Sequence, residues 1–210
     1  MFIDIRDKLV LVVGEYRVLD FKMQKLLEAG AKIKYISEFF PENLKSEIEK
    51  GRVEYLSVNY DPKYLDDAWL VIVGSEDDEL KARIKSDTDQ RKIYTNFVDE
   101  APISSFISPT VISKGDITIA ISTKGKSPAL NRKLKKMISE AIGDEYVKLA
   151  DLLGSIRPKV IKNIAGQKQR AELFERILED RNLLKLVKNN QIDEARSYLD
   201  HFVDQTINLH

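Results

Sequence analysis

Leu9-Val-Leu-Val-Val13-Gly14 is the stretch that decides the fold of this 210-residue chain. A continuous apolar run rich in β-branched residues predicts a strand buried on both faces of a parallel sheet. Apolar residues from Leu19 to Leu27 then recur at helical spacing, and Gly30 is a suitable residue to end that helix. A strand, a glycine turn and a helix in this order begin a βαβ unit.

Four more short apolar segments continue this pattern through the first half of the chain. They are Ala31–Ile36, Val53–Val58, Leu70–Val73 and Ile93–Val98. Ser75 is expected to cap the helix that follows the third of these segments, with the acids of residues 76–78 near the positive end of its dipole. Strands that alternate with helices in this way predict an α/β protein with a Rossmann-like, doubly wound parallel sheet.

The pattern changes near Pro102. Two short strands around Lys114-Gly115-Asp116 predict an antiparallel hairpin. Ser127-Pro128 is typical of a helix start, and from Gly143 onward the apolar spacing is helical. We therefore expect three parts, which are a Rossmann-like domain at residues 1–112, a small α+β segment at 113–145 and an all-helical region at 146–210.

Composition excludes several classes of protein. The 34 Lys and Arg residues balance 34 Asp and Glu residues, so the chain lacks the positive surplus of proteins that coat nucleic acid or anionic membranes. No cysteine is present, which excludes thiolate nucleophiles and Cys-ligated metal sites. The longest apolar run, Ala68–Val73, is far shorter than the ~20 residues that span a bilayer. With a charged amino end unlike a signal peptide, these features predict a cytoplasmic protein without a nucleic-acid, membrane or metal partner.

The turn after the first strand is where an α/β sheet of this kind binds a nucleotide phosphate. A dinucleotide fingerprint needs three small residues there, and only Gly14 is present. Glu15 and Tyr16 add negative charge and bulk, and Arg17 offsets part of that charge. Glu38, near the end of the second strand, is well placed to bind a ribose. These residues alone leave open a nucleotide site or a simple chain turn with a surface acid, and they favour the second.

Asp99 directly follows the strand Ile93–Val98, so we expect it at the carboxyl edge of the sheet, where such folds bind ligands. A carboxylate there can act as a general base or hold a metal. Its simpler role is to cap the turn at residues 100–102. Position alone does not decide between these roles.

A basic segment follows. Residues 117–139 contain no acid and carry six cations, which are Lys124, Lys126, Arg132, Lys133, Lys135 and Lys136. A solvated helix face explains most such runs. The alternative is a binding site for a polyanionic small molecule, to which the hydroxyl-rich loop Ser122–Ser127 would contribute.

Several segments together resemble the precorrin-2 dehydrogenase/sirohydrochlorin ferrochelatase family of sirohaem synthesis. They extend along essentially the whole chain and comprise Phe2–Asp7, Leu26–Ala31, Ala68–Val73, Ser75–Asp78, Asn96–Asp99, Ser105–Pro109 and Ile121–Pro128. Several matches in the right order are more specific than any one of them. The resemblance implies an NAD-binding domain, a dimerisation segment at 113–145 and a helical carboxyl-terminal domain in a homodimer.

The resemblance also implies an activity, the NAD-dependent oxidation of precorrin-2 to sirohydrochlorin, with insertion of ferrous iron in some members. Asp99 matches the family's catalytic aspartate, which would accept protons from the macrocycle. The residues expected to bind NAD are Gly14, Arg17, Val18, Glu38, Phe39 and Ser75. Those expected to bind the tetrapyrrole are Thr123, Lys124, Lys126 and Ser127.

The turn after the first strand departs from the family pattern, which normally has three glycines at residues 14–16. Glu15 and Tyr16 replace two of them. An alternative function is therefore a tetrapyrrole-binding chelatase or carrier that has lost NAD binding. A paralogue without any ligand is a third possibility.

Overall fold

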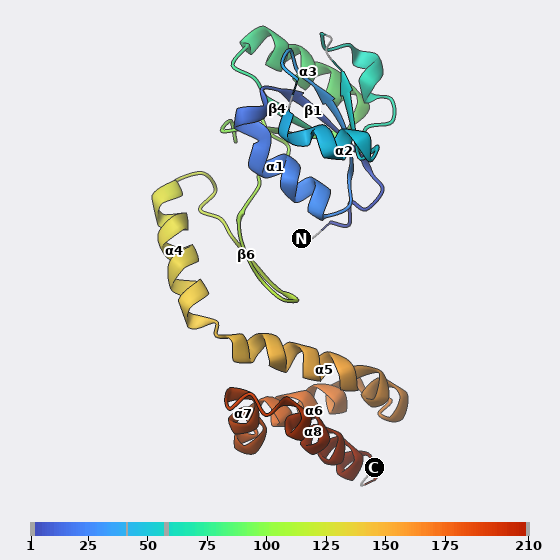
Figure 1. The fold of residues 1–210 in the computed structure, drawn as a ribbon, viewed down its shortest axis with the longest axis vertical. Helices are drawn as coiled ribbons and strands as arrows, with labels where there is room; N and C mark the ends of the chain where they lie inside the picture. Colours follow the sequence, from blue (N-terminus) through green and yellow to red (C-terminus); the bar gives the residue numbers. More distant parts are fainter. Residues whose placement is uncertain (1–2, 41, 57–58, 209–210) are drawn as a thin grey trace. The chain divides into compact units, whose positions relative to one another are not determined.

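The computed structural model describes residues 3–40, 42–56 and 59–208, apart from the side chains of residues 16–18. The chain forms two compact units, Met1–Ser108 and Pro109–His210 (Figure 1). The boundary predicted at residue 112 falls within a strand of the second unit. The further division at residue 145 stays a prediction.

A sheet of five parallel strands forms the centre of the first unit, in the order β3-β2-β1-β4-β5. The strands are β1 (Leu9–Gly14), β2 (Lys32–Ile36), β3 (Val53–Leu56), β4 (Leu70–Gly74) and β5 (Tyr94–Phe97). Each coincides with a predicted segment, with β1 and β4 one residue longer because they include Gly14 and Gly74. Residues 57 and 58 of the third predicted segment lie outside the described residues. The predicted Rossmann-like sheet is therefore confirmed, and its order reverses between β1 and β4, where such folds open a ligand crevice.

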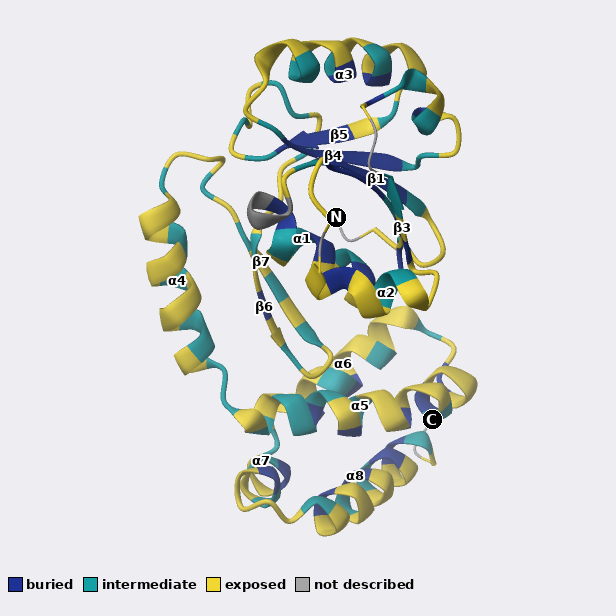
Figure 2. Cartoon of the chain, turned by 45° about the horizontal axis from the view of Figure 1, so that its top comes forward, coloured by how far each residue is buried: buried dark blue, intermediate teal, exposed yellow. Residues whose placement is uncertain are grey.

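Helices cover both faces of this sheet (Figure 1). The elements between the strands are α1 (Tyr16–Glu28), the 3-10 helix η1 (Glu42–Leu44), α2 (Lys45–Glu49), the 3-10 helix η2 (Pro62–Leu65) and α3 (Asp78–Arg91). Alternate residues of β1 explain the two layers, because Val10 and Val12 pack with α1 while Leu11 and Val13 pack with α3. The central strands β1 and β4 are accordingly buried on both faces (Figure 2).

The start of α3 differs from the sequence expectation. Asp77 is the N-cap, since its carboxylate accepts hydrogen bonds from the amides of Glu79 at 2.9 Å and Leu80 at 3.1 Å. The Ser75 hydroxyl instead accepts a hydrogen bond from the Asp77 amide at 3.1 Å. The prediction of Ser75 as the cap is therefore wrong, because a carboxylate two residues further on satisfies two free amides of the first turn.

The second unit begins with the predicted antiparallel hairpin, formed by β6 (Thr110–Lys114) and β7 (Ile117–Ile121). Helix α4 (Pro128–Ala141) follows, beginning where expected, and packs against the hairpin. The Ser127 hydroxyl caps it by accepting a hydrogen bond from the amide of Leu130. The Lys114 ammonium joins the hairpin and the helix by donating to the carbonyl oxygens of Ser139 and Ile142, at 3.0 and 2.6 Å.

Four further helices complete the second unit and confirm the all-helical carboxyl-terminal region. They are α5 (Asp144–Asn163), α6 (Gln167–Glu179), α7 (Arg181–Lys188) and α8 (Ile192–Ile207). Their apolar residues form one core, which includes Leu152, Ile177 and Val203. Across the described part of the chain, none of the helices combines the length and apolar character needed to cross a membrane.

Candidate functional site

A cavity of about 310 Å³ lies at the carboxyl ends of β1, β2 and β4, beside the point where the strand order reverses. It brings together four of the six residues predicted to bind the cofactor, which are Gly14, Glu38, Phe39 and Ser75. Arg17 and Val18 belong to the first turn of α1, but their side chains lie outside the described residues. The cavity is therefore at the place where an open α/β sheet binds a nucleotide.

The turn after β1 is held by a close approach to β4. Gly14 has a φ of +119°, and a Cβ there would lie 2.1 Å from the carbonyl oxygen of Gly74. The amide of Glu15 donates to that same oxygen at 3.2 Å. Only glycine fits this position, because a side chain would meet both a steric clash and an unfavourable backbone conformation.

Tyr35, a residue that no sequence motif singled out, supports the same turn from β2. Its side chain is fully buried, and its hydroxyl donates a hydrogen bond to the carbonyl oxygen of Gly14 at 2.9 Å. Burial raises the pKa of the Tyr35 hydroxyl to about 12, so it remains a neutral donor at physiological pH. Alternation within β2 marks Tyr35 as a core residue but does not show that its hydroxyl reaches the turn.

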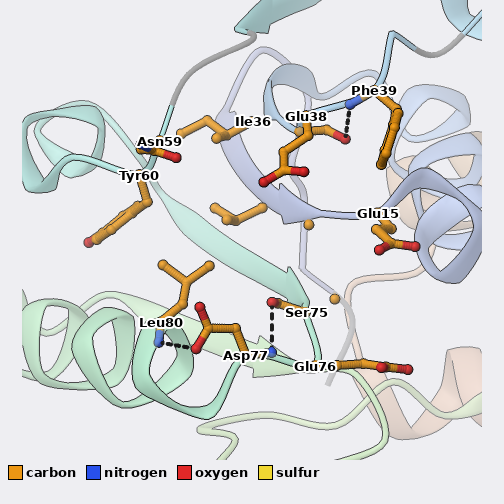
Figure 3. A pocket seen from close by; sticks show the side chains of 14 residues that line it. Glu15, Ile36, Glu38, Phe39, Asn59, Tyr60, Ser75, Glu76, Asp77 and Leu80 are labelled. Atoms are coloured by element: carbon orange, nitrogen blue, oxygen red, sulfur yellow. Dashed lines mark hydrogen bonds between the residues drawn. The ribbon is translucent and has the colours of Figure 1, made fainter.

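Negative charge lines the cavity. Its described lining contains four acids, Glu15, Glu38, Glu76 and Asp77, and neither Lys nor Arg. Figure 3 shows Glu38 directed into the cavity from the β2 side and Asp77 on the opposite side, beside Leu80. Among the described residues, these acids do not come together as a group able to hold a metal ion. The lining is suited to hydroxyl donors such as a ribose, and it opposes a closely placed anion.

The described residues fit a nicotinamide dinucleotide in most respects. Gly14 leaves room for the close approach of a pyrophosphate, and α1 begins after Glu15 without a side-chain cap, so its first amides are available to an anion. Glu38 is placed to accept a hydrogen bond from a ribose hydroxyl. The charge of Glu15 is the feature that does not fit the cofactor, because it lies beside the position that the pyrophosphate would take.

Asp99 lies in the turn that follows β5. The amide of Glu100 donates to the carbonyl oxygen of Phe97 at 3.1 Å, and Asp99 has a φ of +63°, a conformation that aspartate tolerates better than most residues. Its side chain is exposed, and no described residue forms a hydrogen bond or ion pair with the carboxylate. The carboxylate therefore caps none of the described amides of this turn and is free to meet a ligand.

The segment 104–108 runs along the outer edge of β5. The hydroxyl of Ser104 accepts from the amide of Phe97 at 2.9 Å, and the hydroxyl of Ser105 accepts from the amide of Thr95 at 2.6 Å. The amide of Ser105 in turn donates to the carbonyl oxygen of Thr95 at 2.8 Å. These contacts hold the strand that leads to Asp99.

Lys22 of α1 reaches the same strand, and no sequence motif identified it. Its ammonium donates to the Asn96 side-chain oxygen and the Ser108 hydroxyl, both at 2.9 Å. Burial lowers the pKa of Lys22, and the charge of Asp99 opposes that decrease. In the sequence, its position three residues after Leu19, on the apolar side of the helix, is what indicates that it is partly buried.

The four residues predicted to bind the tetrapyrrole lie in the second unit, in the loop between β7 and α4. The Thr123 hydroxyl accepts from the amide of Ser127 at 3.1 Å, and the Ser127 hydroxyl accepts from the amide of Leu130 at 3.2 Å. Both hydroxyls therefore hold the loop in shape. The side chains of Lys124 and Lys126 are exposed.

Comparison with known protein families connects these features. A family model described as putative NAD(P)-binding matches residues 1–110. A model of the sirohaem synthase dimerisation region matches residues 145–202, which form α5–α8 rather than the predicted dimerisation segment at 113–145. The assignment of that segment stays a prediction.

Individual relatives agree with these matches. Siroheme synthase of Photorhabdus laumondii is 30% identical over 206 residues, which cover 98% of this chain and 44% of that protein. Siroheme synthase 2 of Yersinia pestis is 29% identical over 199 residues, which cover 95% and 42%. The chain thus spans less than half the length of these curated relatives.

A solved structure shows the same fold. SirC, a precorrin-2 dehydrogenase, superposes with a TM-score of 0.77 at 22% identity, over 94% of this chain and 98% of that one. The predicted resemblance to the family of sirohaem synthesis is confirmed by these matches. Because the first family model covers more than half of the residues, the chain belongs to the putative NAD(P)-binding family.

Proposed function

We propose that this protein is an NAD-dependent dehydrogenase that oxidises precorrin-2 to sirohydrochlorin. The observation that carries the proposal is the exposed carboxylate of Asp99, to which no described residue forms a hydrogen bond or ion pair, at the same carboxyl edge of the sheet as the cavity. The siroheme synthases and the precorrin-2 dehydrogenase that the chain resembles supply the substrate class.

The oxidation removes a hydride and a proton from the macrocycle. Bound NAD⁺ supplies the acceptor for the hydride. Asp99 accepts the proton at a carboxylate oxygen, a role that requires an ionised and accessible carboxylate. Glu38 binds a ribose hydroxyl, and the first amides of α1 bind the pyrophosphate.

The loop between β7 and α4 binds the carboxylates at the rim of the tetrapyrrole. Lys124 and Lys126 are exposed cations in a segment without acids, which suits a polyanionic ligand. Thr123 and Ser127 maintain the loop through their hydroxyl hydrogen bonds to backbone amides.

Ferrous iron is proposed as a second substrate. Its insertion into sirohydrochlorin replaces two pyrrole N–H protons, and Asp99 is the group that would accept them one after the other. The same carboxylate thereby serves both reactions without a metal site of its own.

A homodimer is the proposed assembly. Helix α4 has no buried residue, and it exposes Leu130 and Met137 on its surface. The match of α5–α8 to a dimerisation region supports association of two copies. Light scattering of the purified chain is expected to give twice the monomer mass, and a monomer across the accessible concentration range would contradict this proposal.

The activity is tested by titrating the purified protein with NAD⁺ and then measuring NADH absorbance after adding precorrin-2 without oxygen. We expect saturable binding of NAD⁺, NADH formation, and weaker binding of NADP⁺, since Glu38 repels a 2′-phosphate. Tetrapyrrole binding without NAD⁺ binding would identify the alternative, a chelatase or carrier. Binding of neither ligand would overturn both.

A further inference from the structure

Two neighbouring tyrosines hold the two loops that lie at the edge of the cavity. Tyr35 and Tyr55 are paired residues of the parallel strands β2 and β3, and both side chains pack in the core that includes α1. The Tyr35 hydroxyl donates to the carbonyl oxygen of Gly14 in the turn after β1. The Tyr55 hydroxyl donates instead to the carbonyl oxygen of Ser37, at 3.1 Å, in the loop after β2. Each tyrosine therefore reaches a different loop of the same cavity.

The loop after β2 places Glu38 between two peptide groups that are each held by a hydrogen bond. The carbonyl group of Ser37 belongs to the peptide bond before Glu38, and the Tyr55 hydroxyl holds it. The amide of Phe39 belongs to the peptide bond after Glu38, and it donates to the Ser37 hydroxyl at 3.3 Å. Because each peptide group is planar, fixing both of them restricts the two backbone dihedral angles of Glu38. These two hydrogen bonds therefore set the direction in which the Glu38 side chain leaves the backbone.

The Tyr55 ring is itself fixed by two aromatic neighbours. Phe40 packs edge-on against it, with ring centroids 5.2 Å apart and an interplanar angle of 87°. The ring of Tyr35, which is fully buried, lies at a centroid distance of 6.1 Å. Ser37 is buried as well. The hydrogen bond between Tyr55 and Ser37 thus joins two groups that have already lost most of their freedom of movement.

The carboxylate of Glu38 depends on this backbone support. Its side chain is exposed, and no described residue forms a hydrogen bond or ion pair with it. Figure 3 shows it directed into the cavity. A carboxylate in that position accepts hydrogen bonds from an unmodified ribose and repels a 2′-phosphate, and both effects weaken if the side chain turns toward solvent.

We propose that Tyr55 is a positioning residue that directs Glu38 toward the ribose and thereby sets the preference for a dinucleotide without a 2′-phosphate. Loss of the Tyr55 hydroxyl frees the peptide group before Glu38, so the carboxylate spends less time at the ribose. The inference rests on the proposed binding of NAD⁺ in this cavity. It goes beyond that binding by assigning the preference to a residue outside the described lining.

The preference is measured by calorimetric titration of NAD⁺ and NADP⁺ into wild type, Tyr55→Phe, Glu38→Ala and the double variant. Tyr55→Phe is expected to lower the ratio of the NAD⁺ affinity to the NADP⁺ affinity about fivefold, because NAD⁺ loses a hydrogen bond and NADP⁺ loses repulsion. In the Glu38→Ala background the same substitution should leave the ratio unchanged, since no carboxylate remains to be positioned. Tyr198→Phe, which removes a tyrosine hydrogen bond to Asp180 in the second unit, is the matched control and should change neither affinity.

A ratio that does not fall in Tyr55→Phe, or that falls equally without the Glu38 carboxylate, would overturn the inference. Tyr55→Leu also lacks the hydroxyl and takes the place of Tyr55→Phe if thermal unfolding shows that the latter does not fold.

Hydrogen exchange of the Phe39 amide, followed by NMR without any cofactor, adds a readout that is independent of binding. Exchange should be faster in Tyr55→Phe than in wild type, because the loop around Glu38 opens more often. Equal rates in the two proteins would overturn the inference whatever the affinities are. A wild type that binds neither dinucleotide would instead contradict the proposed function, while the exchange rates would still decide whether Tyr55 positions Glu38.

Discussion

The turn after β1 and the loop between β7 and α4 are both proposed to bind an anion, and the two regions differ in structure and in charge. The first provides a glycine with a positive φ and the free amides of a helix, but its surroundings are acidic. The second is held by hydrogen bonds to its own hydroxyls, and it carries exposed lysines in an acid-free segment. Backbone geometry is the main feature of the first region, and side-chain charge is the main feature of the second.

This difference shows that the shape of the turn after β1 and the charge around it depend on different groups. The close approach of Gly14 to Gly74 and the hydrogen bond from Tyr35 maintain the turn whichever side chain stands at the next position. Glu15 then adds repulsion that affects the ligand rather than the fold. The two regions are therefore expected to respond differently to substitution.

The largest effect is expected at Asp99, because the proposed proton transfer depends on this one carboxylate. Asp99→Asn keeps the left-handed backbone, which asparagine also tolerates, and removes the proton acceptor. We expect kcat for NADH formation to fall by about 10²–10⁴-fold with an unchanged thermal transition. An Asp99→Asn variant that retains wild-type turnover would show that the proton goes elsewhere.

Gly14→Ala is expected to destabilise the protein by disturbing the backbone of the turn after β1. The new Cβ would clash with the carbonyl oxygen of Gly74, so we expect the free energy of unfolding to fall by about 2–4 kcal/mol in urea titrations. Gly51→Ala is the control, since Gly51 also has a positive φ but a methyl group there would meet nothing within 4 Å. Equal losses in the two variants would mean that the close approach of β1 and β4 has no energetic role.

Glu15→Gln tests the charge of the first region separately, because it removes the acid and leaves the backbone of the turn in place. Removing the acid beside the pyrophosphate position should strengthen NAD⁺ binding about fivefold at low ionic strength, with less effect at high salt. Calorimetric titration measures the change. Glu28→Gln, at the far end of the same helix, is the control and should leave the affinity for NAD⁺ unchanged. An equal gain in affinity in Glu28→Gln would show that repulsion between Glu15 and the pyrophosphate is not the cause.

The smallest effect is expected in the basic loop, whose charges are exposed and screened. Replacing both Lys124 and Lys126 by Gln should raise KM for the tetrapyrrole about threefold and leave kcat nearly unchanged. Lys168→Gln, an exposed lysine of α6, is the control. A loss confined to kcat would indicate that the loop acts on the chemical step rather than on binding.

Most of the fold could be predicted from the sequence because it depends on local patterns. Continuous apolar runs in β1 and β4 identify buried strands, and Ser127-Pro128 identifies the start of α4. The cap of α3 was harder, since residues 75–78 offer several side chains able to cap and the backbone selects Asp77.

The site was predicted less completely, since its contacts join distant parts of the chain. Gly14 and Glu38 could be placed because the ends of parallel strands meet at one edge of the sheet. The contact between Lys22 and Asn96 spans 74 residues and depends on how α1 crosses the sheet, and no local pattern carries that information. The hydroxyl of Tyr35 reaches Gly14 for a similar reason.

The segment beside β5 has a consequence for association. A strand at the edge of a sheet exposes amide and carbonyl groups that can pair with a strand from another molecule and lead to aggregation. Here the hydroxyls of Ser104 and Ser105 already occupy amides on that edge, and they do so from an irregular segment that a further strand cannot extend. The strand that carries Asp99 is thus protected from pairing with another chain, while the carboxylate beyond its end stays open to a ligand.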